Sequence, residues 1–156
     1  ANVGKHVILG DIRVEKENIP EHDILVGGFP CQPFSTFGKL QGFKDEERGG
    51  LFFEIKDILE KHKTKVVVLE NVKNLVNHDG GETFKRIITE LDAIGYDCYY
   101  QVLNSADYGI PQRRNRIFIV GFLRGCFKES KFIFPEKKEF LAANLIQHRR
   151  EWQQED

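Results

Sequence analysis

The 156-residue sequence contains no methionine and only three cysteines. The cysteines are odd in number and lie far apart, at Cys31, Cys98 and Cys126, with no C-x-x-C pair, so the sequence indicates neither a disulfide framework nor a zinc site. No apolar run approaches the ~20 residues that span a bilayer, and the N-terminus has no signal-peptide core. These absences favour an intracellular, cytoplasmic protein with no membrane partner and no bound metal.

An excess of charge of one sign is also missing, because 23 Lys and Arg residues offset 24 Asp and Glu residues to a net charge of −1. Bulk charge therefore does not hold this chain on nucleic acid, and any such contact needs a local basic patch. Hydrophobic residues make up 40% of the sequence, which is enough apolar material for a core. The length lies within the ~100–200 residues that a single domain usually occupies.

The spacing of apolar residues predicts alternating strands and helices. We expect strands over residues 24–26, 65–69, 96–103 and 117–123, a weak strand at 132–134, and helices over residues 51–62 and 84–91. Gly95 stands where a glycine often ends a helix. This order predicts an α/β fold with a mainly parallel sheet, in which the last two strands pair antiparallel at one edge.

Two unusual clusters follow predicted strands. Residues 27–35 read GGFPCQPFS, and residues 70–72 read ENV. Ligands of open α/β sheets bind beyond the carboxyl ends of the strands, and neighbouring strands lie ~4.8 Å apart. If the two strands are neighbours, Cys31 and Glu70 converge on one small site. A thiol beside a carboxyl group suggests a nucleophile and an acid.

Each of these residues also has an ordinary structural interpretation. A single cysteine is more often a small buried apolar residue, and we assign that role to Cys98 and Cys126. Cys31 stands between two prolines in a polar, glycine-rich segment, where core packing is implausible. Glu70 alone would be interpreted as a helix-capping carboxylate, but its pairing with Cys31 favours a functional role.

A third cluster, YGIPQRRNR at residues 108–116, leads into the last strong strand. Strand alternation would place Arg114 and Arg116 on one face and Arg113 on the other. A run of this kind is most often a solvated edge, an interpretation that is strongest for Arg113. The five histidines are scattered without the spacing of metal ligands, which favours surface or structural roles.

The three clusters, in this order and spacing, resemble the motifs of DNA (cytosine-5-)-methyltransferases, and most closely those of bacterial restriction–modification enzymes. The resemblance extends from Gly10-Asp11-Ile12 to about Phe134. It implies a Rossmann-like, S-adenosylmethionine-dependent methyltransferase sheet that is mostly parallel, has an antiparallel edge and lacks its first strands. It also implies methyl transfer to carbon 5 of cytosine in double-stranded DNA.

The resemblance assigns a role to each matched catalytic residue. Cys31 is the nucleophile that adds to carbon 6 of cytosine. Glu70 hydrogen-bonds the ring N3 and the exocyclic amine and donates a proton to N3, and we expect burial to favour the protonated form that this requires. Arg116 binds the cytosine O2, and Arg114 positions the thiolate and its loop.

The resemblance also assigns cofactor and DNA contacts. S-adenosyl-L-methionine is the expected cofactor, with Asp11 accepting a hydrogen bond from the adenine amine and Ile12 packing on that ring. Pro30 and Leu51 are further cofactor contacts. The target base must be flipped out of the duplex, and residues 35–48 resemble the lid that closes over it. The remaining substrate and DNA contacts expected from the matched motifs are Gln32, Ser35, Lys39, Asn71 and Val72.

Some motifs of the family pattern are missing from this sequence, so we expect only part of the catalytic domain. The glycine-rich turn and the acidic residue that hold the cofactor's methionine and ribose do not precede Gly10. We expect residues 1–135 to be a partial catalytic domain and residues 136–156 a charged tail leading towards an absent target-recognition domain. The chain alone is then expected to be inactive or nearly so, and its exposed sheet edge would favour self-association.

Two other functions stay open. An RNA cytosine-5 methyltransferase would use the same carbon 6 chemistry, and a non-catalytic relative would bind DNA or a protein partner on the same scaffold. A non-catalytic relative would be expected to lack Cys31 or Glu70, and both are present. For the favoured function, we expect a cytoplasmic enzyme that associates with the nucleoid through DNA.

Overall fold

Strands and helices alternate along the chain, which confirms the predicted α/β class. The computed structural model describes residues 10–30, 50–128 and 131–137. Helices are labelled α, and segments of 3-10 helix are labelled η. The elements are α1 (Ile12–Glu15), η1 (Lys16–Asn18), β1 (Ile24–Gly28), α2 (Leu51–His62), β2 (Val66–Val72), η3 (Lys73–Gly81), α3 (Glu82–Ala93), β3 (Tyr96–Asn104), η4 (Ser105–Tyr108) and β4 (Asn115–Leu123).

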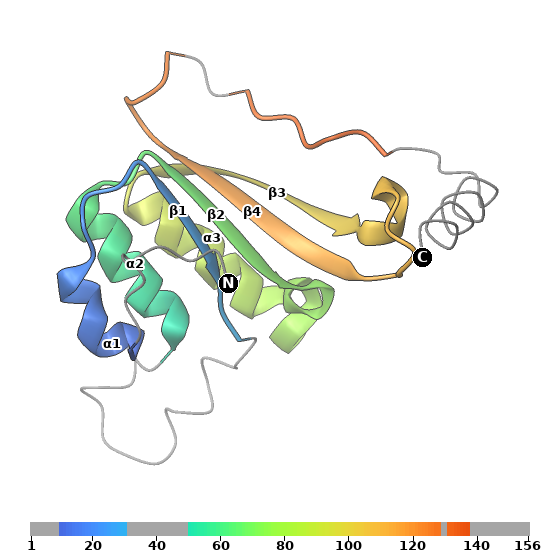
Figure 1. Ribbon diagram of the computed structural model, residues 1–156, viewed down its shortest axis with the longest axis horizontal. Helices are drawn as coiled ribbons and strands as arrows, with labels where there is room; N and C mark the ends of the chain where they lie inside the picture. The colour runs from blue at the N-terminus through green and yellow to red at the C-terminus, as the bar shows by residue number, and fades with distance from the viewer. Residues whose placement is uncertain (1–9, 31–49, 129–130, 138–156) are drawn as a thin grey trace, which may run out of the picture.

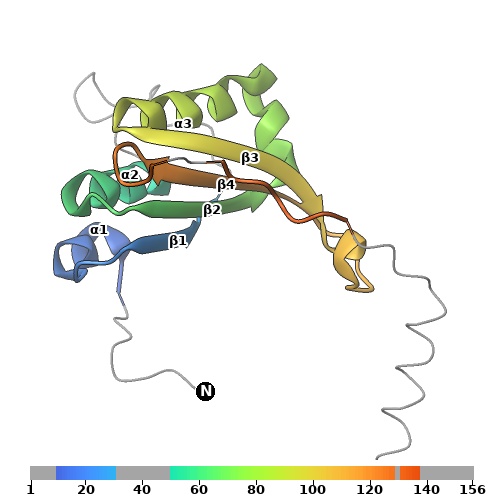
Figure 2. The same cartoon turned by 90° about the horizontal axis from the view of Figure 1, so that it is seen from above.

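The four strands of the described residues form one sheet in the order β1-β2-β4-β3 (Figure 1). Figure 2 shows the strands in this succession. β1 pairs parallel with β2, whereas β4 pairs antiparallel with both β2 and β3. Three strands therefore run in one direction, and β4 runs against them. The expected antiparallel pair of the last two strands is present at the β3 edge, but β4 itself lies inside the sheet, because strand order is not encoded in local apolar spacing.

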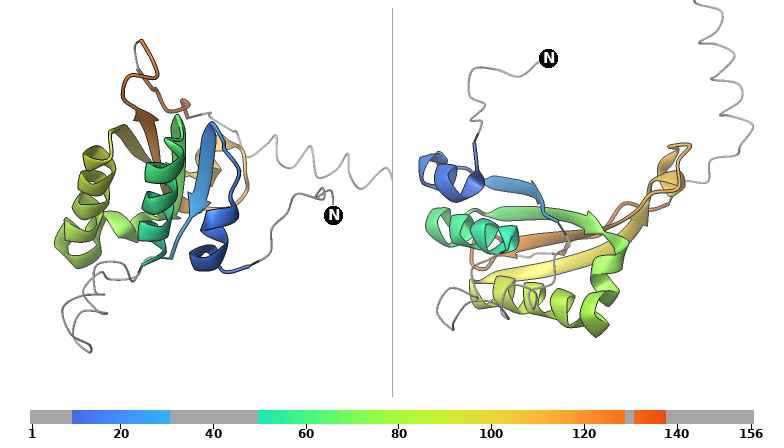
Figure 3. Two further views of the ribbon diagram at one scale, coloured as in Figure 1. Left: turned by 90° about the vertical axis from the view of Figure 1, so that its left-hand side faces the viewer. Right: turned by 90° about the horizontal axis from the view of Figure 1, so that it is seen from below.

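The helices cover one face of this sheet. In the left panel of Figure 3, α3, α2 and α1 lie side by side in front of the strands, and α2 contacts both of the other helices. The core forms between this layer and the sheet, where Val67 and Leu69 of β2 meet Leu59 of α2 and Ile87 of α3. All four side chains are fully buried, so the helix-facing side of β2 cannot move without opening the core.

Both predicted helices are present, and the residues at their ends agree with the sequence analysis. α2 begins at Leu51 and ends at His62, with the residues of its apolar stripe packed in the core. After α3, Gly95 has a φ of 99°, and its N–H donates to the Asp92 carbonyl at 2.9 Å. A side chain is disfavoured at that φ, which is why a glycine follows this helix. The short segments α1, η1, η3 and η4 have no counterpart in the prediction, because one or two turns leave no clear period.

The opposite face of the sheet is open near β1 and covered by aromatic rings near β3. Ile24 and Val26 of β1 are 59% and 76% exposed. At the β3 side, the Phe132 ring centroid lies 6.1 Å from that of Tyr99 and 5.8 Å from that of Phe122. The apolar side chains of this face are therefore only partly covered within the described residues.

The weak strand predicted at 132–134 is wrong. Residues 131–137 carry no strand, although they cross the sheet beside β3 and β4. The Phe132 ring packs on the face of the sheet. Phe132 and Phe134 also pack on each other, with 4.9 Å between their ring centroids. The alternation reflects aromatic contacts rather than a hydrogen-bonded ladder.

No helix among residues 10–30, 50–128 and 131–137 is both long enough and apolar enough to cross a membrane.

The close packing between β4 and β2 gives a stability test. A Cβ built on Gly121 would lie 2.7 Å from Val67 Cγ1 and 3.3 Å from Cys98 Sγ. We expect Gly121→Ala to lower the free energy of unfolding by about 1–3 kcal/mol, because the methyl group overpacks a filled core. Chemical denaturation followed by circular dichroism measures the change.

Gly27→Ala in β1 is the matched control for that measurement. A Cβ there meets no atom closer than 3.4 Å, which is ordinary contact. The control should unfold at the wild-type midpoint or slightly above it, since alanine restricts the unfolded chain more than glycine does. Equal losses in the two variants would contradict the close packing at Gly121.

Candidate active site

The centre of the candidate site is the carboxyl end of β2. The strand continues through Glu70 and Asn71 to Val72, so these residues belong to the strand rather than following it. Glu70 points to the open face of the sheet, and Asn71, only 3% exposed, points to the helix-covered face. Glu70 pairs in register with Gly28 of β1, which shows that the two strands are neighbours as expected.

Glu70 forms an ion pair with Arg116 of β4. The distance from Arg116 Nε to Glu70 Oε1 is 2.6 Å, which is short enough for a charge-assisted hydrogen bond. In the β2–β4 register, Glu70 lies opposite Phe118 and Val72 lies opposite Arg116, so the two charged side chains are diagonal neighbours on one face. The pair joins residues that lie 46 positions apart in the printed sequence.

The expected burial of Glu70 is not found. Its side chain is 39% exposed, and that of Arg116 is 22% exposed. Both groups lie on the sheet face that the helices leave open, which is the physical reason for their exposure. A carboxyl group on this face meets solvent and a cation rather than an apolar environment.

Asn71 fixes the first residue after β1. Its side-chain amide donates to the Phe29 carbonyl at 2.7 Å, and its Oδ1 accepts from the Val72 N–H at 2.8 Å. The Phe29 ring is buried and packs on Phe52 of α2, with 5.6 Å between centroids. The chain just after β1 is therefore held at Phe29 by a buried hydrogen bond and an aromatic contact.

Arg114 lies outside β4, which begins at Asn115. The alternation that was to place it on the face of Arg116 does not reach it, so that part of the prediction loses its basis. Its backbone is held instead by the preceding turn: the Arg114 N–H donates to Asn104 Oδ1 at 3.1 Å, and its carbonyl accepts from the Ser105 N–H at 3.1 Å. The Arg114 side chain is exposed, and so is that of Arg113.

Residues 131–137 also hold this turn. The Tyr108 hydroxyl donates to the Pro135 carbonyl at 3.0 Å, and Lys137 Nζ lies 3.0 Å from Asp107 Oδ2. The hydrogen bond to Asp107 raises the pKa of Lys137, so the lysine keeps its charge. The segment after β4 thereby fixes the turn that leads into β4.

A pocket of about 710 Å³ lies along β1 between α1 and α2. Three of the four residues assigned to the cofactor line it, namely Asp11, Ile12 and Leu51. Pro30 is described and exposed but is not part of the lining. Gly28 borders both this pocket and Glu70, because a Cβ on Gly28 would lie 3.5 Å from Glu70 Oε2.

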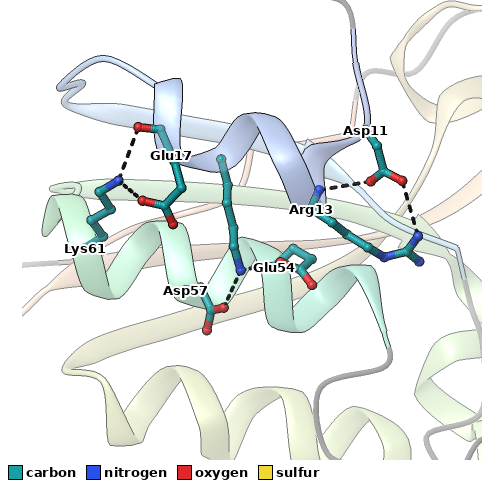
Figure 4. A network of polar contacts seen from close by, with 7 residues as sticks. Asp11, Arg13, Glu17, Glu54, Asp57 and Lys61 are labelled. Atoms are coloured by element: carbon teal, nitrogen blue, oxygen red, sulfur yellow. Dashed lines mark hydrogen bonds and ion pairs between the residues drawn. The ribbon is translucent and has the colours of Figure 1, made fainter. Parts of the chain in front are cut away.

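Asp11 caps α1. Its Oδ1 accepts from the Arg13 N–H at 3.0 Å, and its Oδ2 lies 3.4 Å from the Arg13 guanidinium (Figure 4). Both side chains are more than half exposed. The carboxylate is thus oriented by the helix that it begins, while remaining accessible from the pocket.

Several predicted site residues lie outside the described residues. These are Cys31, Gln32, Ser35 and Lys39, together with the lid expected at residues 35–48. Their roles stay predictions. Within the described ranges, no three His, Cys, Asp or Glu side chains gather closely enough to hold a metal ion.

The structure brings together residues that the sequence analysis treated as scattered. The rings of His22 and His62 lie 5.1 Å apart, and His22 Nε2 lies 3.0 Å from the Thr64 hydroxyl. His22 also lines the pocket. No signal in the sequence pairs these residues. His22 lies shortly before β1 and His62 shortly before β2, and the parallel pairing of these two strands brings their starting ends together.

The carboxylate–guanidinium pair and the adjoining pocket define an α/β protein with a polar site on the carboxyl side of its sheet. The family model of C-5 cytosine-specific DNA methylases matches residues 1–155. The chain belongs to this family, which confirms the resemblance found in the three motifs.

Two relatives show how much of the family's length is covered. The chain is 49% identical over 137 residues to the type II methyltransferase M.NgoBI of Neisseria gonorrhoeae, covering 87% of this chain and 41% of the relative. It is 56% identical over 115 residues to the type II methyltransferase M.HaeII of Haemophilus aegyptius, covering 73% of this chain and 36% of the relative. The chain thus spans about two fifths of the length of these curated relatives.

A solved structure supports the fold. A DNMT2 mutant from Spodoptera frugiperda matches with a TM-score of 0.52 and 20% sequence identity, covering 88% of this chain and 41% of the other. At this identity the similarity concerns the arrangement of helices and strands alone.

The buried amide of Asn71 gives a second test. We expect Asn71→Ala to lower the free energy of unfolding by about 1–3 kcal/mol, because the Phe29 carbonyl and the Val72 N–H lose a buried partner. Asn18→Ala is the control, since its amide contacts Glu15 at the surface, and its loss should stay below about 0.5 kcal/mol. Urea denaturation of both variants decides, and similar losses would contradict the anchoring role of Asn71.

The two described cysteines should differ in reactivity. Burial first, and then the charges of Asp92 and Asp97, raise the pKa of the Cys98 thiol to about 12, whereas Cys126 is exposed. Because the thiolate is the reactive form, a thiol that keeps its proton is slow to alkylate. We expect iodoacetamide at mildly alkaline pH to label Cys126 well before Cys98, as measured by peptide mass spectrometry. Equal labelling of the folded protein would refute the protected state of Cys98, and guanidinium-unfolded protein is the control in which both should react.

Proposed function

We propose that this protein transfers a methyl group from S-adenosyl-L-methionine to carbon 5 of cytosine in double-stranded DNA. The observation that carries the proposal is the Glu70–Arg116 pair, 2.6 Å from Nε to Oε1, in a chain of the C-5 cytosine-specific DNA methylase family. Cytosine presents a ring N3, an exocyclic amine and a carbonyl O2 along one edge. An adjacent carboxyl group and guanidinium are complementary to that edge.

Arg116 has donors to spare within the described part of the chain. Its Nε binds Glu70, and its Nη1 donates to the Asn115 carbonyl at 3.0 Å. A guanidinium carries five N–H donors, so others are available for the cytosine O2, where negative charge develops as carbon 6 is attacked. Arg116 would then orient Glu70 and stabilise the charge on the base at the same time.

Glu70 would present its second oxygen to the base. Oε1 is held by Arg116, while Oε2 faces Gly28, where no side chain intervenes. The carboxyl group would accept a hydrogen bond from the exocyclic amine and, in its protonated form, donate a proton to N3. A bound base would cover the exposed carboxyl group, which the sheet face alone leaves open to solvent.

Cys31 is the proposed nucleophile. It follows Gly28 by three residues, a stretch that spans at most about 11 Å, so an approach of its thiol to a base held by Glu70 lies within the reach of the chain. The thiolate would form a bond to carbon 6 while N3 takes the proton of Glu70, and carbon 5 thereby becomes nucleophilic. The cofactor supplies an electrophilic methyl group to carbon 5. Carbon 5 would then lose its proton to a water molecule as the bond between Cys31 and carbon 6 breaks and the thiolate leaves. N3 would return its proton to the Glu70 carboxylate, which restores both the ring and the acid.

The pocket beside β1 suits the nucleoside part of that cofactor. Its volume of about 710 Å³ is typical of small-molecule sites. Asp11 offers carboxylate lone pairs to an amine, and its orientation is already set by the Arg13 N–H. Ile12 and Leu51 supply apolar surface for a purine ring, and Pro30 would add a backbone contact.

Double-stranded DNA is the proposed macromolecular substrate, with the target base flipped out because carbon 6 is inaccessible within the duplex. Residues 35–48 would close over the base. Residues 1–135 would form the catalytic part and residues 136–156 the tail, in a cytoplasmic enzyme associated with the nucleoid. The contacts proposed for the base and the duplex come from Gln32, Ser35, Lys39, Asn71 and Val72. Arg114 would position the thiolate and its loop.

A covalent trap tests this function. We expect the full-length protein to form a denaturant-stable adduct with a DNA duplex that carries 5-fluorocytosine, because fluorine on carbon 5 blocks the final elimination. Cys31→Ser should abolish the adduct and methyl transfer while DNA binding in a gel shift persists. Cys126→Ser, which removes an exposed thiol outside the site, should retain both activities.

The outcome also separates the alternatives. Methyl transfer that survives in Cys31→Ser would overturn the nucleophile assignment. An adduct with RNA but not with DNA would favour the RNA methyltransferase, and DNA binding with no adduct on either substrate would favour a non-catalytic relative.

A further inference from the structure

The segment that carries Asp11 and Ile12 is not held by a core of its own. α1 and η1 bury none of their residues. Nevertheless Gly10, Asp11, Ile12 and Arg13 form one wall of the pocket. Since apolar burial is the usual source of helix docking, another interaction must hold this wall in place.

That interaction is a lysine placed between two carboxylates of α2. Lys16 Nζ lies 2.6 Å from Glu54 Oε2 and 2.7 Å from Asp57 Oδ2 (Figure 4). Glu54 and Asp57 are three residues apart and therefore lie on one face of α2. A second pair supports the same junction, because Lys61 Nζ lies 2.6 Å from Glu17 Oε2.

The burial of Lys16 and Glu54 strengthens their ion pair. The side chain of Glu54 is 11% exposed and that of Lys16 is 21% exposed, so solvent screens this pair much less than an ordinary surface pair. Burying a carboxylate to this extent costs free energy unless a cation pairs with it. Hydrogen bonds to Asp57 and Glu54 raise the pKa of Lys16, which therefore stays charged.

We propose that Lys16 is a positioning residue for the cofactor pocket: by binding Glu54 and Asp57 it docks α1 on α2 and so holds Asp11 and Ile12 opposite Leu51. The proposal rests on the proposed function for the identity of the ligand. Lys16 itself is not part of the pocket lining, so it acts through the position of α1 and not by touching the ligand.

The sequence supplies a matched control for this lysine. Lys56 on α2 binds Glu90 of α3 at 2.7 Å, and its side chain is 21% exposed, the same fraction as that of Lys16. Lys56 joins two helices but lies outside the pocket lining. A loss of helix docking in general would affect both lysines, whereas a role in positioning the pocket wall concerns Lys16 alone.

The test compares Lys16→Met with Lys56→Met in the full-length protein. We expect Lys16→Met to raise the KM for S-adenosyl-L-methionine about tenfold, with kcat at saturating cofactor within about twofold, because the reacting groups are untouched. Lys56→Met should leave the KM unchanged, and Lys16→Arg, which keeps the charge, should restore most of the wild-type value. Hydrogen exchange should accelerate at residues 12–18 in Lys16→Met and not in Lys56→Met.

Other outcomes are decisive as well. Unchanged exchange at residues 12–18 in Lys16→Met would overturn the docking role. An equal rise of KM in both variants would show that Lys16 contributes only to general stability and does not position the pocket wall. If the wild-type protein binds no S-adenosyl-L-methionine in calorimetry, the proposed function fails, while the exchange measurement still decides whether Lys16 docks α1.

Discussion

The register between β2 and β4 is the constraint on which the candidate site depends. It places Val72 opposite Arg116 and Glu70 opposite Phe118, which brings the two charged side chains together on the open face. A slip by one residue would turn Arg116 towards the helices and expose the neighbouring core positions. Ile117 and Ile119 are each only 1% exposed on the helix-covered face, so the cost of uncovering them prevents the slip. The hydrophobic core thereby fixes the geometry of a polar pair on the other side of the sheet.

The two sides of the proposed reaction site are held by different forces. The side with Glu70, Asn71 and Arg116 stands on central strands whose opposite face is fully packed. The wall formed by α1 buries no residue and is attached through Lys16 and Lys61 to α2. Segments with few apolar contacts open at lower free energy than core strands do. A proposed catalytic pair on a rigid support and a proposed cofactor wall on a charged junction are consistent with a ligand that must enter and leave.

Apolar spacing predicted the six main elements because each of them packs a periodic face against the core. Its failures have identifiable causes. The alternation at residues 132–134 is aromatic packing on the sheet face, and the alternation at Arg114 stops because the ladder begins at Asn115. Burial of Glu70 was expected because the role that the resemblance assigns to it requires a protonated carboxyl group. The helices cover only the other face of the sheet, and the pattern of a single strand does not reveal which of its faces is covered. His22 and His62 could not be paired from the sequence at all.

The amino-acid sequence by itself determined the types of the main elements and the motifs that mark the C-5 cytosine-specific DNA methylase family, because both depend on residues that are close together in the chain. The tertiary structure alone decided that β4 enters between β2 and β3, that Arg116 meets Glu70, and that Lys16 meets Glu54 and Asp57. These contacts join residues 38 to 46 positions apart in the chain. Separation of that kind leaves no periodic trace, since only the packing of whole elements brings such residues within hydrogen-bond distance.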